Sequence, residues 1–345
     1  MGGTGTRLRP LTDTRPKPMM PLVDRPFVEH QIDLLRRHGV DDVIFSCGYR
    51  PDALEEHFGD GSGIGMRVRY VVDPEPLGTA GAVKNAEPLL GDDPFLVLNG
   101  DILTDLDLGA VLAAHRGFGG AGMVVLTPVE DPSAFGLVRL HDDGAVEAFV
   151  EKPRPDELRP GEPFRINAGT YVLTPDALAR IPAGRSCSIE REIFPVLADE
   201  GSLHGYPSDA YWRDIGTPAS YLGAVHDVLR GALLTATPTG DLYVGEGALI
   251  EPSATVGGLT AVGPRARVAA GAVVRGSVLG AATTVGEGAE VAEALVGEGV
   301  SVGRGARLLP GSIVGDGAVI AADAVVEGGE PVPTGGVVGA DRALR

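Results

Sequence analysis

The sequence predicts an α/β protein in two parts: an α/β domain with a mixed sheet, followed by a parallel β-helix. Two observations carry this prediction. Up to about residue 232, segments with a helical apolar stripe alternate with short apolar runs of strand length, which is the pattern of an α/β sheet. From residue 242 onward, one aliphatic residue recurs at nearly every sixth position, which is typical of stacked β-helix coils.

The domain boundaries follow from the same two patterns. We expect an α/β domain over residues 1–232 and a short polar linker over 233–241. A β-helix over 242–328 and a C-terminal tail over 329–345 complete the chain. A chain of 345 residues is long enough for two domains with separate cores.

The α/β part begins with a helix over residues 27–38, which has apolar positions at 28, 32 and 35 and is stopped by Gly39. The pair Asp143-Gly144 predicts the turn of a hairpin within residues 137–150, so the sheet is expected to be mixed. A last helix over 217–230 begins with Thr217 as cap and Pro218 at the first position. Further predicted strands are 42–46, 67–72, 95–98 and 122–127, and further predicted helices are 79–87 and 107–116.

The repeat in the C-terminal part has two irregularities. The spacing of six shortens to five between Val274 and Leu279, and again between Val291 and Val296. We interpret both slips as shortened corners between the flat sides of a coil. The aliphatic series is Val244, Ile250, Val256, Val262, Val268, Val274, Leu279, Val285, Val291, Val296, Val302, Leu308, Val314, Ile320 and Val326.

Composition excludes several classes of protein. A net charge of −18 and an isoelectric point near 4.8 argue against a nucleic-acid partner, because such a surface needs a basic footprint. No apolar run is long enough for a membrane span, and no signal peptide precedes the body. Two cysteines form no disulfide framework, which fits a reducing compartment. We therefore expect a cytoplasmic protein without a membrane partner.

The first eighteen residues have the composition of a phosphate-binding loop. Gly2, Gly3 and Gly5 allow a close approach of the main chain to phosphate oxygens. Arg7 and Lys17 follow as charges that can neutralise a triphosphate. For the glycines alone, a disordered terminus with a solvated charge cluster is an equally good interpretation.

The complete pattern resembles a known family. Gly2-Gly-Thr-Gly-Thr-Arg-Leu-Arg-Pro-Leu-Thr12 followed by Pro16-Lys-Pro18 is similar to the signature of sugar-nucleotide pyrophosphorylases, which join a sugar 1-phosphate to a nucleoside triphosphate. The resemblance implies a Rossmann-like nucleotidyltransferase domain, a left-handed hexapeptide-repeat β-helix and Mg²⁺ as cofactor. In that family the glycines follow an apolar strand, whereas Met1 directly precedes Gly2 here. We expect the natural start to lie upstream and to encode roughly five to ten mostly apolar residues.

Two carboxylates are candidate metal ligands. Asp101 follows the apolar run 95–98, at the strand end where ligands of open α/β sheets bind. Asp214 belongs to the segment Trp212-Arg-Asp-Ile-Gly-Thr217. Taken alone, Asp101 could equally cap a helix. In the resembling family, both positions hold the metal that bridges the phosphates.

The remaining site residues are assigned by the resemblance. It implies catalytic roles for Arg7, Lys17, Asp101, Lys152 and Asp214. A second glycine-rich turn before a helix, residues 75–81, is expected to recognise the base or ribose, with a simple capped turn as the alternative. Arg9 and Arg15 receive no role and are interpreted as surface charges. The implied nucleotide-binding residues are Gly2, Gly3, Gly5, Thr6, Glu75, Gly78 and Thr79, and the implied sugar-phosphate residues are Gly136, Glu151, Lys152, Asn167 and Gly169.

The likeness is greatest to mannose-1-phosphate guanylyltransferases, because of residues 75–81, the segment 188–195 and the short hexapeptide tail. The expected substrates are GTP and mannose 1-phosphate, giving GDP-mannose and pyrophosphate. A thymidylyl- or uridylyltransferase for glucose 1-phosphate stays open, as does a catalytically silent regulatory subunit that binds a nucleotide sugar. We expect the β-helix to serve stability and homo-oligomerisation. An acyltransferase site there is disfavoured, because all seven histidines precede residue 233.

Overall fold

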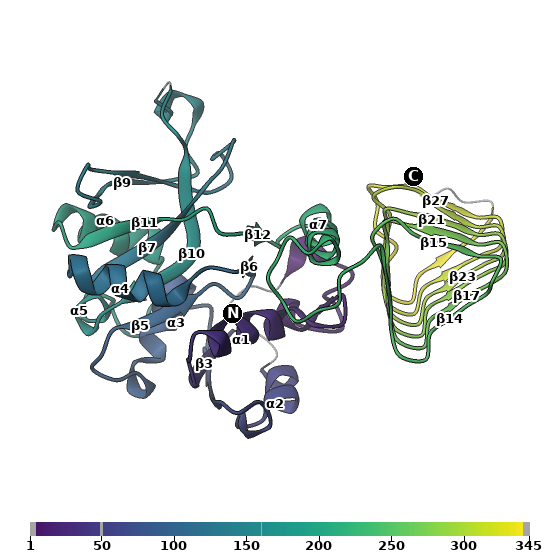
Figure 1. Cartoon of the computed structure of the whole chain (residues 1–345), viewed down its shortest axis with the longest axis horizontal. Helices are drawn as coiled ribbons and strands as arrows, with labels where there is room; N and C mark the ends of the chain where they lie inside the picture. The colour runs from purple at the N-terminus through teal and green to yellow at the C-terminus, as the bar shows by residue number, and fades with distance from the viewer. Residues whose placement is uncertain (1–4, 49–50, 160, 341–345) are drawn as a thin grey trace. The chain divides into compact units, whose positions relative to one another are not determined.

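The computed structural model describes residues 5–48, 51–159 and 161–340. These residues form two compact units (Figure 1). One unit comprises Leu34–Trp212. The other combines residues 5–33 with residues 213–340, so the signature loop at the start of the chain belongs to the same unit as the β-helix. The domain boundaries expected from the sequence stay a prediction.

A six-stranded sheet is the centre of the first unit. The strand order is β11-β7-β10-β8-β9, and β5 pairs with β10. The pair β11–β7 is parallel and the other pairs are antiparallel, so the expected mixed sheet is confirmed. The strands are β5 (Phe95–Leu98), β7 (Gly122–Pro128), β8 (Gly136–Leu140), β9 (Val146–Glu151), β10 (Arg165–Leu173) and β11 (Leu203–Pro207).

Two strands of this unit form a separate parallel pair. β3 (Asp42–Cys47) and β4 (Arg67–Val72) pair from end to end. In the described part of the chain, this pair is not hydrogen-bonded to the six-stranded sheet. Both strands lie where the sequence predicts them, but alternation of helices and strands does not specify which strand edges meet.

N-cap side chains and a C-terminal glycine define the ends of the helices. In α4, the Asp107 carboxylate accepts the Ala110 N–H at 2.9 Å as N-cap. In α7, the Thr217 hydroxyl accepts the Ser220 N–H at 3.2 Å, and Gly231 ends the helix with φ 77°. The helices are α1 (Phe27–Arg37), α2 (Asp52–Phe58), α3 (Gly78–Asn85), α4 (Leu108–Phe118), α5 (Pro175–Ala179), α6 (Phe194–Asp199) and α7 (Pro218–Arg230).

Aromatic and aliphatic side chains between the sheet and α6 form the core of the first unit. Tyr171 of β10 and Phe194 of α6 are fully buried, and their ring centroids lie 5.0 Å apart in an edge-to-face arrangement. Leu126 and Leu203, from the neighbouring strands β7 and β11, complete this cluster. The loops at the ends of these strands therefore start from a firmly packed base.

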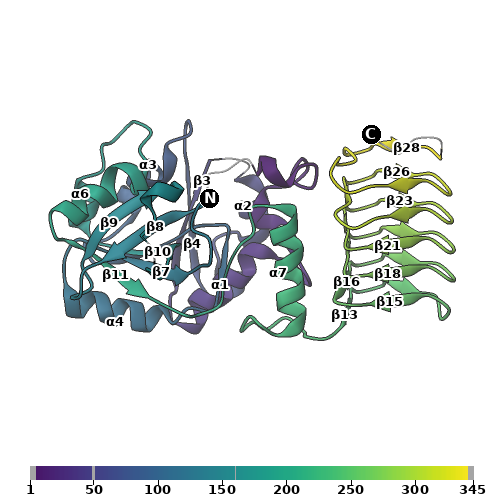
Figure 2. The ribbon, with the colours of Figure 1, turned by 90° about the horizontal axis from the view of Figure 1, so that it is seen from above.

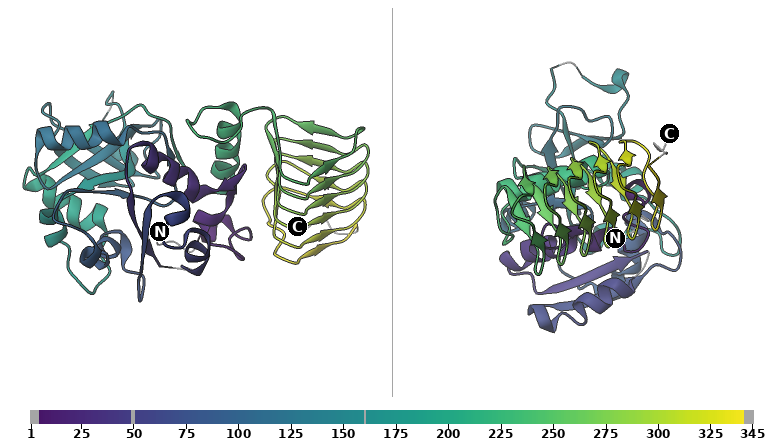
Figure 3. Two further views of the ribbon diagram at one scale, coloured as in Figure 1. Left: turned by 60° about the horizontal axis from the view of Figure 1, so that its bottom comes forward. Right: turned by 90° about the vertical axis from the view of Figure 1, so that its right-hand side faces the viewer.

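The C-terminal part of the second unit is a parallel β-helix with three sheets (Figures 2 and 3). The aliphatic side chains of the series from Val262 to Val326 are buried in one continuous core, and Ile250 and Val256 pack against it. Val244, in the first coil, is 44% exposed. The predicted β-helix is thus confirmed. The first sheet contains β13 (Leu242–Val244), β16 (Thr260–Val262), β19 (Val278–Leu279), β22 (Leu295–Val296) and β25 (Ile313–Val314). The second contains β14 (Leu249–Ile250), β17 (Arg267–Val268), β20 (Thr284–Val285), β23 (Ser301–Val302), β26 (Val319–Ile320) and β28 (Val337–Val338), and the third contains β15 (Thr255–Gly257), β18 (Val273–Arg275), β21 (Glu290–Ala292), β24 (Arg307–Leu308) and β27 (Val325–Val326).

Both five-residue slips lie at one corner, where the chain passes from the third sheet to the first. The residues there, Gly276 and Glu293, have left-handed φ angles of 57° and 44°. Because consecutive coils are shortened at the same place, Val274 and Val291 remain opposite each other and the core stays in register. The coil also extends past residue 328, since Val332 and Val338 continue the spacing and are buried.

No helix in the described residues is long and apolar enough to cross a membrane. Cys47 and Cys187 are both buried free thiols.

Candidate active site

The signature loop, defined here as the described residues 5–17, is a compact turn fixed by its own hydrogen bonds. Gly5 has φ 63°, and its carbonyl oxygen accepts the Thr12 hydroxyl at 2.9 Å and the Leu8 N–H at 3.0 Å. Leu8 is fully buried, whereas Thr6 and Arg7 are exposed. The turn is thus anchored by Leu8 and leaves the side chain of Arg7 exposed. Gly2 and Gly3 lie outside the described residues.

The loop brings Arg7 together with Asp214. A Cβ atom at Gly216 would lie 2.7 Å from Arg7 Nη2 and 2.8 Å from Asp214 Oδ1, so both groups flank this glycine. The Gly216 N–H also donates to Asp214 Oδ1, and the Ser220 hydroxyl donates to the Asp214 carbonyl. Gly216 is a site residue that the sequence assignments missed, although its place in the segment 212–217 was the available signal.

Lys17 begins a short 3₁₀ turn, Lys17–Met19, between the buried residues Pro16 and Pro18. The two prolines restrict φ on either side of the lysine, and the Lys17 carbonyl accepts the Met20 N–H at 3.1 Å. The backbone position of Lys17 is therefore well defined.

The interpretation of Arg15 as an ordinary surface charge is wrong. Its side chain is only 20% exposed, and its guanidinium pairs with Glu298 and, at 2.7 Å, with Asp316. Arg9, by contrast, is 59% exposed and pairs with Asp13 at 3.3 Å, as a surface charge does. Spacing along the chain could not separate the two, because the partners of Arg15 lie about three hundred residues away.

In the first unit, Asp101 lies beside a bulge in β10. The Asn99 N–H, two residues before Asp101, donates to the Gly169 carbonyl at 2.7 Å. Gly169 has φ 73°, and a Cβ there would lie 2.8 Å from Asn99 Nδ2. Asn167 accepts the Gly169 N–H at 2.9 Å and donates to the Tyr171 hydroxyl at 2.8 Å. The structure therefore brings Asn167 and Gly169 to the turn that carries Asp101.

The remaining sugar-phosphate residues lie on the neighbouring strands β8 and β9. Gly136 pairs with Glu151, and a Cβ at Gly136 would lie 3.0 Å from Glu151 Oε2. Lys152 is exposed and has a left-handed φ of 53°, with its N–H donated to the Phe135 carbonyl at 2.8 Å. Strained backbone of this kind gathers at functional sites. Pairing of Leu137 with Ile166 places Gly136 beside the residue that follows Ile166, Asn167.

Trp212 contacts two of these segments, and no role was predicted for it from the sequence. Its indole N–H donates to the Ala168 carbonyl at 2.9 Å, inside the β10 bulge. Its ring meets Phe135 edge to face, with centroids 5.6 Å apart. Trp212 therefore supports both the bulge and the strand that leads into Gly136.

The second glycine-rich turn is tied to the segment 187–190. The Ala80 and Gly81 N–H groups both donate to the Cys187 carbonyl, at 3.0 and 3.2 Å. Thr79 accepts the Ile189 N–H at 2.9 Å and donates to Glu190 at 2.7 Å. These groups act as a capped turn, so their roles in this structure are structural. Glu75 and Gly78 lie exposed on the same turn.

The predicted site residues thus fall into two groups, one in each unit. Arg7 and Asp214 meet in the second unit, and the residues around Asp101 and Glu151 gather in the first. Among the described residues, no three His, Cys, Asp or Glu side chains form a metal cluster. Asp101 and Asp214 supply the oxygen donors that hard cations prefer, so the donor chemistry fits a divalent ion completed by phosphate oxygens. A metal site shared by the two aspartates stays a prediction.

These features define a nucleotidyltransferase, and the chain belongs to the nucleotidyl transferase family, which matches residues 1–231. Residues 238–337 match the GMPPB C-terminal domain. Nucleotidyltransferases of this family generally use a divalent metal ion.

Curated relatives cover most of the chain. It is 39% identical over 286 residues to a mannose-1-phosphate guanylyltransferase of Mycobacterium tuberculosis, covering 81% of this chain and 78% of the relative. It is 38% identical to a mannose-1-phosphate guanyltransferase of Aspergillus fumigatus, covering 74% of this chain and 72% of that one.

Solved structures show a similar fold. HddC from Yersinia pseudotuberculosis in complex with GMP-PN shares 29% identity at a TM-score of 0.55, over 65% of this chain and 94% of that one. A putative glucose-1-phosphate thymidylyltransferase from Bacillus anthracis, in complex with a sucrose, shares 25% identity at a TM-score of 0.58, over 65% and 90% of the two chains.

Proposed function

We propose that this protein is a mannose-1-phosphate guanylyltransferase, which converts GTP and mannose 1-phosphate to GDP-mannose and pyrophosphate. The observation that carries the proposal is the 39% identity to the mycobacterial enzyme of that name over 81% of this chain. The structure adds support, because residues 75–81 and 188–195, two features of the resemblance to guanylyltransferases, contact each other through Thr79 and Glu190.

The proposed reaction is a single displacement at phosphorus. A phosphate oxygen of mannose 1-phosphate attacks the α-phosphorus of GTP, a new O–P bond forms, and the bond to the β-phosphate oxygen breaks. Pyrophosphate leaves with the bonding electrons. Catalysis then depends on position and on neutralisation of charge, because no covalent intermediate with the protein is needed.

The triphosphate is assigned to the signature loop. Arg7 is exposed on a turn whose base is buried, and Lys17 is placed by the prolines on either side. Both cations would neutralise the charge that develops on the phosphates during displacement. The backbone of Gly5 and Thr6 would contact the same phosphates, together with Gly2 and Gly3. Glu75, Gly78 and Thr79 are assigned to the base or ribose, where Thr79 would act through its backbone because Ile189 and Glu190 occupy its hydroxyl.

The sugar 1-phosphate is assigned to the edge formed by β8, β9 and β10. Lys152 would hold its phosphate, and Glu151 and Asn167 would accept or donate hydrogen bonds at sugar hydroxyls. Gly136 and Gly169 would approach the sugar through their backbone. Neither position admits a side chain, since a Cβ at Gly136 would lie 2.8 Å from Phe149 and one at Gly169 would lie 2.8 Å from Asn99.

Asp101 and Asp214 would hold Mg²⁺, which supplies charge neutralisation and orientation of the phosphates when bound. Arg7 flanks Gly216 beside Asp214 and would balance part of the negative charge there.

A substrate panel tests the proposal. Pyrophosphate release is measured with GTP, dTTP, UTP and ATP, each with mannose 1-phosphate and with glucose 1-phosphate. We expect the highest kcat/KM for GTP with mannose 1-phosphate. A preference for dTTP or UTP with glucose 1-phosphate would favour the second candidate, which the likeness to the Bacillus anthracis protein supports.

A catalytically silent regulatory subunit is the alternative from another class. Arg7, Lys17, Asp101, Lys152 and Asp214 are all present, which argues against it. Binding of GDP-mannose without turnover of any pair in the panel would support that alternative.

The β-helix is proposed to mediate homo-oligomerisation. Leu249, Val319 and Val337 project from its second sheet and are 55%, 43% and 72% exposed. Val319 and Val337 are paired neighbours, so a second copy could cover both. Sedimentation of the V319K/V337K variant should then show a smaller species than the unmodified chain. A cytoplasmic location also stays a prediction.

A further inference from the structure

The signature loop rests on two neighbouring corners of the β-helix. One corner carries Glu298, and the next coil carries Asp316. A Cβ atom at Gly315 would lie 2.9 Å from Pro10 Cγ, so the middle of the loop lies directly on the second corner. All of these residues belong to one compact unit.

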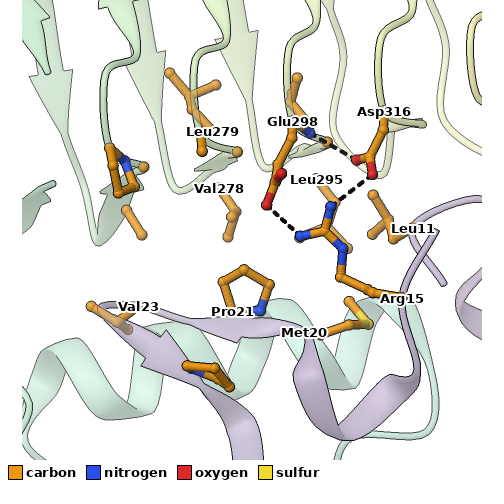
Figure 4. Close-up of a pocket in the computed structure, with 18 of the residues that line it drawn as sticks. Leu11, Arg15, Met20, Pro21, Val23, Val278, Leu279, Leu295, Glu298 and Asp316 are labelled. Atoms are coloured by element: carbon orange, nitrogen blue, oxygen red, sulfur yellow. Dashed lines mark hydrogen bonds and ion pairs between the residues drawn. The ribbon is translucent and has the colours of Figure 1, made fainter. Parts of the chain in front are cut away.

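Arg15 is the polar connection between the loop and those corners (Figure 4). Its Nη1 pairs with Glu298, and its Nη2 donates to Asp316 Oδ2 at 2.7 Å. The Thr14 hydroxyl donates to the same Asp316 oxygen at 2.6 Å. One guanidinium therefore spans two coils, which a lysine cannot do with equal geometry.

The acceptor Asp316 is also held in place by a hydrogen bond within the β-helix. Asp316 Oδ1 accepts the Glu298 N–H at 2.8 Å, which leaves Oδ2 directed at the loop. Asp316 is 15% exposed, so water competes little for it, whereas Glu298 is 41% exposed. Burial acts to lower the pKa of Arg15, but hydrogen bonds and charges of Glu298 and Asp316 outweigh burial and raise it.

Packing near the pair is incomplete. A cavity of about 220 Å³ lies between the loop and the β-helix and is lined by Leu11 and Met20 on one side and Val278 and Leu295 on the other (Figure 4). Side chains on opposite sides of a cavity lack van der Waals contacts with one another. The position of the loop therefore depends on the polar pair and on Pro10 more than on a continuous apolar interface.

We propose that Arg15 is a positioning residue for the nucleotide half of the active site, and that the β-helix takes part in catalysis by holding the signature loop through Asp316 and Glu298. Arg15 lies two residues before Lys17 and is separated from it only by Pro16, whose φ is restricted, so loss of its contacts is expected to displace Lys17. This inference rests on the proposed function, in which Lys17 and Arg7 bind the triphosphate.

The test is a kinetic comparison of the full-length R15A variant with R9A. Arg9 belongs to the same loop, carries the same charge and pairs only with Asp13 among the contacts described here. R15A should raise the KM for GTP about tenfold and leave the KM for mannose 1-phosphate within twofold. R9A should leave both unchanged. R15K should recover part of the loss, because it keeps the charge but reaches one carboxylate.

Variants of the β-helix complete the test. D316N keeps an acceptor for the Glu298 N–H and removes the charge, so it should resemble R15A, and E298Q should have a smaller effect because that side chain is more exposed. The double variant R15A/D316N should be little worse than either single variant. Kinetic constants of R15A equal to those of R9A would overturn the proposal, as would effects of R15A and D316N that multiply. Equal losses for both substrates, together with a lower Tm, would also overturn it.

The same variants separate this inference from the proposed function. If the unmodified protein turns over no substrate pair, the proposed function fails, and the Kd for GTP from titration calorimetry becomes the readout. A tenfold weaker Kd for R15A than for R9A would then still support the positioning role. A protein that binds no nucleoside triphosphate at all would overturn both.

Discussion

Arg7 and Asp214 flank the α-carbon of Gly216, where a methyl group would lie 2.7 Å from one and 2.8 Å from the other. Glycine has no Cβ, so Arg7 of the signature loop and Asp214, a candidate metal ligand, can both lie against this backbone position. The buried backbone of Gly216 also donates its N–H to Asp214. A side chain at Gly216 is therefore expected to displace both charged groups.

Replacing Gly216 by alanine should lower kcat by roughly tenfold to a hundredfold, because small displacements of catalytic groups have effects of that order. Stability should hardly change, since Arg7 Nη2 is the end of a flexible side chain and can move away. Steady-state kinetics and thermal unfolding measure the two effects.

Gly223→Ala is the matched control. A methyl group there would lie 2.8 Å from Arg213 Nη1, a contact of the same kind in α7. The control should keep its activity. Equal activity of both variants would remove Gly216 from the site.

Asp101→Asn and Asp214→Asn should each reduce turnover by a hundredfold or more while the protein remains folded. An amide keeps the shape and the acceptor but loses the charge that binds Mg²⁺. Turnover is measured over a range of Mg²⁺ concentrations, and the fold by circular dichroism. Asp92→Asn, at an exposed position, serves as control. Near-normal turnover of either variant at low Mg²⁺ would contradict the metal assignment.

Lys152→Gly should separate stability from function. The left-handed φ of 53° is strained for lysine but not for glycine, so the free energy of unfolding should rise by about 1 kcal/mol or stay unchanged. Loss of the ammonium should raise the KM for mannose 1-phosphate at least tenfold. Chemical unfolding and substrate kinetics give the two readings.

Ala282→Gly provides the comparison, because Ala282 has φ 56° in the β-helix, away from the proposed site. It should show a similar change in stability and normal kinetics. A Lys152→Gly variant with an unchanged KM would exclude Lys152 from the sugar-phosphate site.

The protein should become less stable as the pH is lowered, because His30 is buried in its neutral form. This side chain is 4% exposed and lies 3.0 Å from the Thr235 hydroxyl through Nδ1 and 3.2 Å from the Leu22 carbonyl through Nε2. Burial lowers the pKa of His30 from 6.5 despite the Leu22 contact. The unfolded chain therefore takes up a proton first, and the contribution of His30 is present above pH 6.5 and lost as pH falls through the lower folded pKa.

The urea midpoint should thus decrease between pH 7.5 and pH 5.0, and His30→Gln should show a smaller decrease. Despite burial, the hydrogen bond from Arg25 lowers the pKa of Asp24, and the Asp24 carboxylate raises the pKa of Arg25. His30→Gln leaves both of these groups, and Asp33, in place. An identical pH dependence for the two proteins would rule out His30 as the source.

Local patterns predicted the elements well where the signal lay within a few residues. Thr217 and Pro218 begin α7 as expected, and Asp143-Gly144 forms the turn between β8 and β9. The aliphatic series predicted the β-helix because each coil repeats the same local requirement for one inward side chain. The coil continues to Val338 because Val332 and Val338 keep the six-residue spacing, and β28 pairs with β26 as the strands of earlier coils pair with their neighbours.

Contacts between distant segments could not be predicted in the same way. The burial of Arg15 depends on Asp316, and the separate pairing of β3 with β4 depends on which strand edges meet. Neither leaves a periodic trace in the sequence. In the turn 75–81, the N–H groups of Ala80 and Gly81 donate to the Cys187 carbonyl, another distant partner that the sequence pattern does not reveal. The role of this turn at the base or ribose stays a prediction.

By itself, the sequence determined the two-part fold, the family signature and the identity of the charged residues, because periodicity and short motifs are local properties of the chain. Only the tertiary structure decided that the signature loop lies on the β-helix, that Arg15 joins them and that Gly216 admits Arg7 beside Asp214. These are relations between residues far apart in sequence, and they arise when folding excludes water and makes unpaired charges costly.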